Sequence, residues 1–133
     1  MPRASPVFRA SVEAAYSALN AGDLDGFLAR THPDVEFTSI VAEAEGTTFR
    51  GHAGVREWWS TVPAAFEGVS WDVLDIRGDD DRGVVRVHMA GRLSGVPVEQ
   101  HMWQAVRFSG EIATWWAFFR SEREALAAVG LES

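Results

Sequence analysis

The stretch Tyr16–Phe37, YSALNAGDLDGFLARTHPDVEF, carries the signals that decide the fold. Asn20-Ala21-Gly22 follows apolar residues at helical spacing and predicts a helix end, because glycine readily adopts the left-handed conformation of a helix cap. Asp23 predicts the N-cap of a short second helix, which the His32-Pro33 pair ends. From Asp34 the apolar residues alternate, which predicts a strand. We therefore interpret the aspartates of this stretch as cap and turn residues, not as an acid–base site.

The rest of the chain shows the same two patterns of apolar residues, helical spacing and strand alternation. Helical spacing recurs in two further segments, and a period of two, interrupted by turns such as Ser94-Gly95 and Ser109-Gly110, indicates antiparallel strands. We predict the α+β class, with helices on one face of a curved antiparallel sheet, and one domain over residues 1–133. The predicted elements are helices at 6–20 and 23–31, a strand at 34–40, a loop or hairpin at 41–48, a helix at 52–66, strands between 69 and 120, and a helix at 121–131.

The composition excludes several kinds of partner. All 12 basic residues are arginine, and against 19 acidic residues they leave a net charge of −7. This charge disfavours binding to nucleic acids and to anionic membrane surfaces. No cysteine is present, no two histidines have metal-ligand spacing, and the first residues contain no apolar leader segment. We expect a cytoplasmic protein with no metal and no cofactor.

Four segments resemble one known family: ALNAGDLDGFLA, HPDVEF, FRGHAGVREWW and FFRSEREALAAVGL. They are similar to the SnoaL-like branch of the nuclear-transport-factor-2-like superfamily, and the resemblance covers nearly the whole chain. It implies a cone-shaped sheet wrapped round three N-terminal helices, with a deep apolar pocket at the open end. The superfamily includes ketosteroid isomerase, polyketide cyclases, limonene epoxide hydrolase and members that only bind or scaffold. The resemblance therefore implies a fold more strongly than an activity.

The ketosteroid isomerase site combines an aspartate base with a tyrosine and a protonated aspartic acid. When the chain is aligned on LNAGDLDG, the tyrosine position falls on Ala15, one residue before Tyr16. The base position falls on Ser39, or on Thr38 if the register shifts, and neither is a carboxylate. The acid position falls on Gln104, whose amide still donates hydrogen bonds. The resemblance thus implies Gln104 as an oxyanion donor, with Tyr16 or Ser39 as a second polar contact.

Strand alternation sorts the remaining side chains onto two faces of the sheet. The predicted pocket face carries apolar walls and polar amides but no carboxylate, so proton abstraction from carbon lacks a base there. A shift of one residue in the fourth strand would instead bring His101 into the pocket, but it would also bury Arg107. The residues predicted to contact a ligand are Met89, Gln100, Met102, Trp115 and Phe119, together with Phe37 and Trp59.

The opposite face of the sheet is predicted to carry an apolar patch made of Trp103, Trp116 and Phe118, with His88 and His101 at its rim. An exposed apolar patch is typical of an interface, so we expect a homodimer through this face. Two functions stay open from the sequence. The first is binding of a small apolar, ring-containing molecule with divergent isomerase- or cyclase-like chemistry, and the second is a non-enzymatic binding or scaffold protein.

Overall fold

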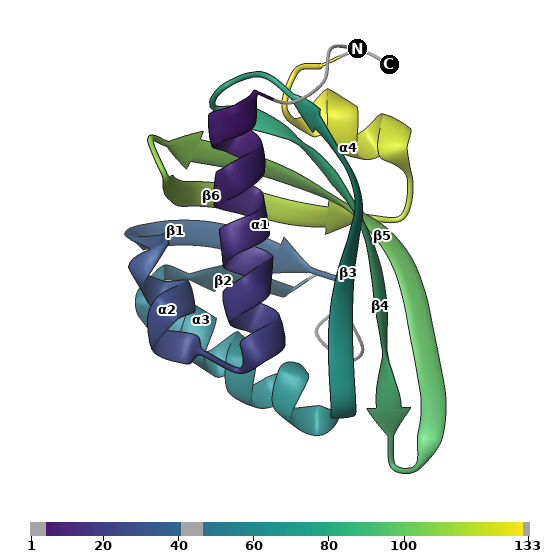
Figure 1. Ribbon diagram of the computed structural model, residues 1–133. Helices are drawn as coiled ribbons and strands as arrows, with labels where there is room; N and C mark the ends of the chain where they lie inside the picture. Colours follow the sequence, from purple (N-terminus) through teal and green to yellow (C-terminus); the bar gives the residue numbers. More distant parts are fainter. Residues whose placement is uncertain (1–4, 41–46, 132–133) are drawn as a thin grey trace.

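The computed structural model describes residues 5–40 and 47–131 (Figure 1). Helices at the N-terminal end of the chain are followed by a strand meander and a closing helix, which confirms the predicted α+β class. The predicted loop or hairpin at 41–48 lies mostly outside the described residues. The elements are α1 (Pro6–Ala21), α2 (Leu24–Ala29), β1 (Thr31–Ser39), β2 (Thr47–Arg50), α3 (Gly51–Thr61), η2 (Pro63–Ala65), β3 (Glu67–Gly78), β4 (Arg82–Leu93), β5 (Val96–Ser109), β6 (Ile112–Phe119) and α4 (Glu122–Ala128).

The strands form one six-stranded sheet in the order β2-β1-β6-β5-β4-β3. All neighbours are antiparallel except β1 and β6, which run parallel. The prediction of a purely antiparallel sheet was wrong at this one pairing. A short turn forces its two strands to be antiparallel, but β1 and β6 are far apart in the chain and no such turn sets their relative direction.

Several helix boundaries follow local signals of the sequence, but the predicted stop of the second helix at His32-Pro33 was wrong, because α2 ends at Ala29 and both residues lie in β1. The Asp23 side chain accepts a hydrogen bond from the Gly26 backbone N–H at 2.9 Å and so caps α2. Gly22 ends α1 with φ of 71°, a conformation that glycine adopts without a steric penalty. At the other end of the chain, Ser121 accepts from the Glu124 N–H at 3.2 Å and caps α4. The interpretation of Asp23 as a cap residue is confirmed.

Helices cover both faces of the sheet, so the prediction of helices on one face was wrong for the closing helix α4. In Figure 1, α1 crosses in front of the sheet, α2 and α3 lie beside β1 and β2, and α4 lies against the far end of β4 and β5. The larger apolar cluster fills the space between the first three helices and the inner sheet face. A smaller cluster lies under α4 and contains Val84, Ala105, Ala125, Leu126 and Val129. No helix of the described residues is long and apolar enough to span a membrane.

A β-bulge in β6 changes which side chains face the helices. Arg107 of β5 pairs with Trp115, but the next residue, Phe108, pairs with Ala113, so Thr114 is the extra residue. Before the bulge Ala113 faces inward. After it the alternation is reversed, so Trp116 and Phe118 face inward while Trp115 and Phe119 pack in the cluster under α4. The predicted faces of these four aromatic residues were therefore wrong.

Candidate functional site

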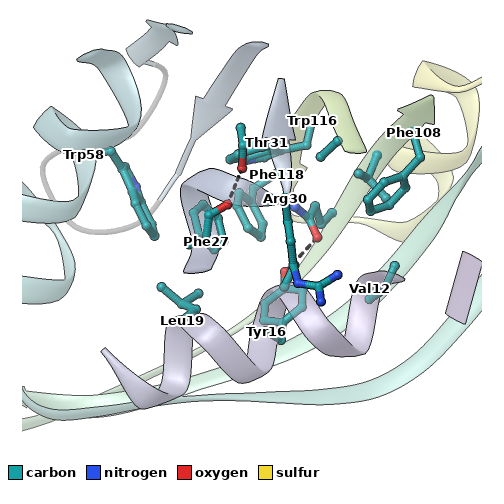
Figure 2. Close-up of a pocket in the computed structure, with 14 residues that line it drawn as sticks. Val12, Tyr16, Leu19, Phe27, Arg30, Thr31, Trp58, Phe108, Trp116 and Phe118 are labelled. Atoms are coloured by element: carbon teal, nitrogen blue, oxygen red, sulfur yellow. Dashed lines mark hydrogen bonds between the residues drawn. The ribbon is translucent and has the colours of Figure 1, made fainter. Parts of the chain in front are cut away.

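A cavity of about 40 Å³ lies between α1, the end of α2 and the inner face of β5 and β6 (Figure 2). Most of its walls are apolar or aromatic side chains, and four residues bring polar groups: Tyr16, Arg30, Thr31 and Gln104. The apolar lining residues are Val12, Ala15, Leu19, Phe27, Trp58, Val106, Phe108, Ala113, Trp116 and Phe118.

The central polar feature is a hydrogen bond of 2.7 Å between the Tyr16 hydroxyl and Gln104 Oε1. Tyr16 comes from the buried face of α1 and Gln104 from the inner face of β5, and their exposed fractions are 6% and 8%. Burial raises the pKa of the Tyr16 hydroxyl above its ordinary value, because a phenolate would lose its hydration in this apolar environment. Tyr16 is therefore protonated at neutral pH and acts as a hydrogen-bonding group, not as a base.

The Tyr16–Gln104 pair has hydrogen-bond donors that find no acceptor among the described residues. With Gln104 Oε1 accepting from Tyr16, the Gln104 amide nitrogen has no hydrogen-bond partner among the described residues. The oxygen and nitrogen of the amide are placed from the hydrogen-bond network, and the opposite placement would leave the Tyr16 O–H and one amide N–H unused. In both arrangements the pair offers at least two unused donors to a neighbouring acceptor.

The other predicted polar residues lie elsewhere in the interior. Ser39 is fully buried on β1 and accepts a hydrogen bond from the Trp58 indole N–H at 3.2 Å. Trp58 lines the cavity, whereas Ser39 is not among the described lining residues. Gln100 donates to the Ile40 carbonyl at 3.3 Å and does not line the cavity. The structure thus brings Tyr16 and Gln104 together but not Ser39.

The predicted ligand-contacting walls are interior residues that do not line this cavity. Met89 and Met102 are fully buried on the inner sheet face. Phe37 stacks on Trp116 with ring centroids 4.5 Å apart, and Trp59 packs against Phe27 at 5.5 Å, so both support lining residues from behind. Trp115 and Phe119 point to the α4 side of the sheet because of the bulge.

The outer sheet face lacks the predicted apolar patch. Trp116 and Phe118 point into the cavity, and Trp103 is half-buried against the cluster under α4. His88 and His101 form a cross-strand pair, with ring centroids 4.6 Å apart. Carboxylates surround this pair, with Glu99 at 3.4 Å and Asp72 at 3.8 Å from His88 nitrogens. This part of the face is polar, and the homodimer stays a prediction.

The sequence-based reasoning missed several lining residues, of which Arg30 and Trp116 matter most for chemistry. Arg30 follows the last turn of α2 and is the only charged residue among the described lining residues. The described residues contain no group of three or more histidine or carboxylate side chains placed to hold a metal ion.

The chain was compared with known families, curated proteins and solved structures. The SnoaL-like domain family matches residues 12–125. No curated protein matches significantly.

Three solved structures illustrate the likeness in fold. TerC, co-crystallised with polyporic acid, has a TM-score of 0.73 and 25% identity, over 96% of this chain and 98% of TerC. Rv0760c of Mycobacterium tuberculosis, in complex with estradiol-17beta-hemisuccinate, has a TM-score of 0.72 and 16% identity, over 89% and 95% of the two chains. A Catenulispora acidiphila protein with a ketosteroid isomerase-like fold, in complex with trimethylamine, has a TM-score of 0.67 and 22% identity, over 92% and 93%. Because the family matches most of the chain and these structures share its architecture, the chain belongs to the SnoaL-like domain family, within the nuclear-transport-factor-2-like fold.

Proposed function

We propose that this protein binds a small, apolar, ring-containing molecule in the cavity beside α1, and that Tyr16 and Gln104 hold one oxygen atom of that molecule. The observation that carries the proposal is the buried Tyr16–Gln104 pair with unused donors in an otherwise aromatic cavity. The cone-shaped sheet with a pocket at its open end, which the family resemblance implies, is part of the same proposal.

The physical argument starts from the unused donors. A ligand carbonyl or hydroxyl oxygen that accepts from the Gln104 amide adds one hydrogen bond, and such a bond typically contributes about 0.5–1.5 kcal/mol. The aromatic walls favour a ring, since ring pairs add about 0.5–1.5 kcal/mol beyond the burial of their area. Cavities of this kind, with apolar walls and a few convergent polar groups, are the usual form of small-molecule sites.

The relatives support the chemical class of the ligand. TerC was crystallised with polyporic acid and Rv0760c with estradiol-17beta-hemisuccinate. The cavity of about 40 Å³ is smaller than the roughly 150 Å³ that an engineered apolar cavity uses to bind benzene. Binding a ring therefore requires one or more wall side chains, such as Phe118 or Trp58, to change rotamer.

Binding is better supported than proton-transfer catalysis. None of the described lining residues is a carboxylate or a histidine, and Tyr16 is held protonated. Gln104 can polarise a ligand carbonyl by donating a hydrogen bond, and Tyr16 orients the Gln104 amide. The described lining residues include no general base. Ser39 contributes through its bond to the Trp58 indole, which orients one wall.

Calorimetry with 2-acetylnaphthalene, a neutral ketone with two aromatic rings, tests the proposal. We expect the wild-type protein to bind it and Gln104→Leu to bind it about 5- to 10-fold more weakly, which corresponds to the loss of one hydrogen bond. Asp25→Asn, in the first turn of α2, is the matched control because Asp25 does not line the cavity, and it should leave the affinity unchanged. No binding to the wild type, or equal binding by Gln104→Leu, would overturn the assignment.

A further inference from the structure

Arg30 places a positive charge at the rim of the cavity. It lies where α2 ends, and it lines both the cavity and an open groove on its solvent side. In Figure 2 its side chain extends toward α1, and the guanidinium lies between Tyr16 and Val12 in this view. Arg30 is half-buried, so its charge is less well solvated than that of an arginine on an open surface.

The guanidinium of Arg30 has no partner within the described protein. No ion pair or side-chain hydrogen bond of Arg30 is formed, whereas other arginines, such as Arg77 and Arg82, are paired with carboxylates. Asp23 and Glu111 line the groove on the solvent side of Arg30, yet neither forms an ion pair with it. Five N–H donors are therefore free beside an apolar cavity.

We infer that the ligand of this cavity is an amphipathic acid, whose ring body occupies the aromatic cavity and whose carboxylate, or a similar planar anion, pairs with Arg30. This inference rests on the proposed function and specifies its ligand class. A guanidinium accepts a carboxylate through two parallel N–H···O bonds, and such charge-assisted bonds are stronger than neutral ones. The unused donors of the Tyr16–Gln104 pair line the same cavity and add hydrogen bonds for the acid group or for an oxygen near it.

The charge balance of the chain makes this arrangement selective. At a net charge of −7, the protein as a whole repels anions, so an anionic ligand gains affinity only where a local positive charge exceeds this background. Arg30 is the only positive charge among the described lining residues, and its removal should abolish the preference for an anion without changing the apolar walls.

A matched pair of probes tests the inference by calorimetry. The probes are 2-naphthoate and 2-acetylnaphthalene, which share their rings and one carbonyl and differ in a carboxylate oxygen against a methyl group. We expect the wild type to bind 2-naphthoate at least tenfold more tightly than 2-acetylnaphthalene. Arg30→Gln should weaken 2-naphthoate by about 10- to 100-fold and change 2-acetylnaphthalene by less than about twofold. Arg30→Lys keeps the charge but loses the planar guanidinium. Its affinity for 2-naphthoate should lie between those of the wild type and Arg30→Gln.

Arg56→Gln is the control for charge alone, because Arg56 is exposed on α3 and is not among the lining residues. It should leave both affinities unchanged. If both probes bind but Arg30→Gln affects them equally, or if the wild type prefers neither, the acid-binding inference fails while the proposed function stands. If 2-acetylnaphthalene does not bind the wild type, the proposed function itself fails. Circular dichroism and urea unfolding confirm that each variant is folded.

Discussion

Replacing Gln104 by leucine should destabilise the protein through Tyr16, not through Gln104 itself. The two side chains are nearly fully buried, and the Tyr16 hydroxyl donates to Gln104 Oε1 at 2.7 Å. Leucine fills much of the glutamine volume but removes the acceptor, so the hydroxyl is left buried without a partner. Tyr16→Phe has the opposite effect, since it removes the hydroxyl and leaves the Gln104 amide unpaired.

The expected loss of stability follows from the free energy that it costs to leave a buried polar group without a hydrogen-bond partner. Each single substitution should lower the free energy of unfolding by about 1–3 kcal/mol. The double variant Tyr16→Phe/Gln104→Leu leaves no polar group unpaired, so its loss should be smaller than the sum of the single losses by about 1 kcal/mol or more. For a chain of 133 residues, a loss of 2 kcal/mol lowers Tm by roughly 6–10 °C.

Urea unfolding followed by circular dichroism measures this cycle. Ser17→Ala is the matched control, because it removes a hydroxyl from the neighbouring, exposed position of α1 and should change stability by less than about 0.5 kcal/mol. Additive single effects, with a coupling free energy near zero, would show that the Tyr16–Gln104 bond is not formed in solution and would refute the description of the cavity.

The remaining predictions address the walls, the titration, the cap and the assembly. Phe118→Ala should destabilise the fold by about 3–5 kcal/mol yet tighten binding of 2-acetylnaphthalene, because it enlarges the cavity; weaker binding would contradict this. Tyr16 is the only tyrosine, and folding raises the pKa of its hydroxyl. The contribution of Tyr16 to the free energy of unfolding is therefore fully present below about pH 10 and is lost as the pH rises toward the folded-state pKa. Tyrosinate absorbance should appear only together with unfolding. Asp23→Ala should cost about 1 kcal/mol in urea unfolding, against less than about 0.5 kcal/mol for Asp25→Asn. Analytical ultracentrifugation at micromolar concentration should show a homodimer, and a monomeric mass would refute that prediction.

Local signals made the helices and most strands predictable. Gly22, Asp23 and Ser121 act on backbone groups within a few residues of themselves, so their roles need no knowledge of the rest of the fold. The burial of Val35, Phe37 and Ser39 on one face of β1 was also predictable, since alternation is a property of a single strand.

The cavity was only partly predictable. The resemblance placed Gln104 in a pocket-facing position, and the structure confirms its inward direction. The sequence offered Tyr16 or Ser39 as the second polar group beside Gln104 but did not decide between them, and it did not predict that Arg30 would border the same cavity. Such contacts depend on how α1 and α2 lie on the sheet, which no short-range pattern encodes.

By itself, the sequence determined the class of the fold, the cap residues Gly22, Asp23 and Ser121, the net charge of −7 and the family. Only the tertiary structure decided which aromatic residues of β6 face the cavity. The segment Trp115–Phe119 is apolar throughout, because α4 covers one face of the sheet and the N-terminal helices cover the other, so no alternation marks an inner side. The bulge at Thr114, which reverses the faces, is a feature of strand pairing, and the register shifts there between β6 and β5 and also between β6 and β1. The side chains that line this site were therefore set by strand register, a property of two strands together and not of either sequence alone.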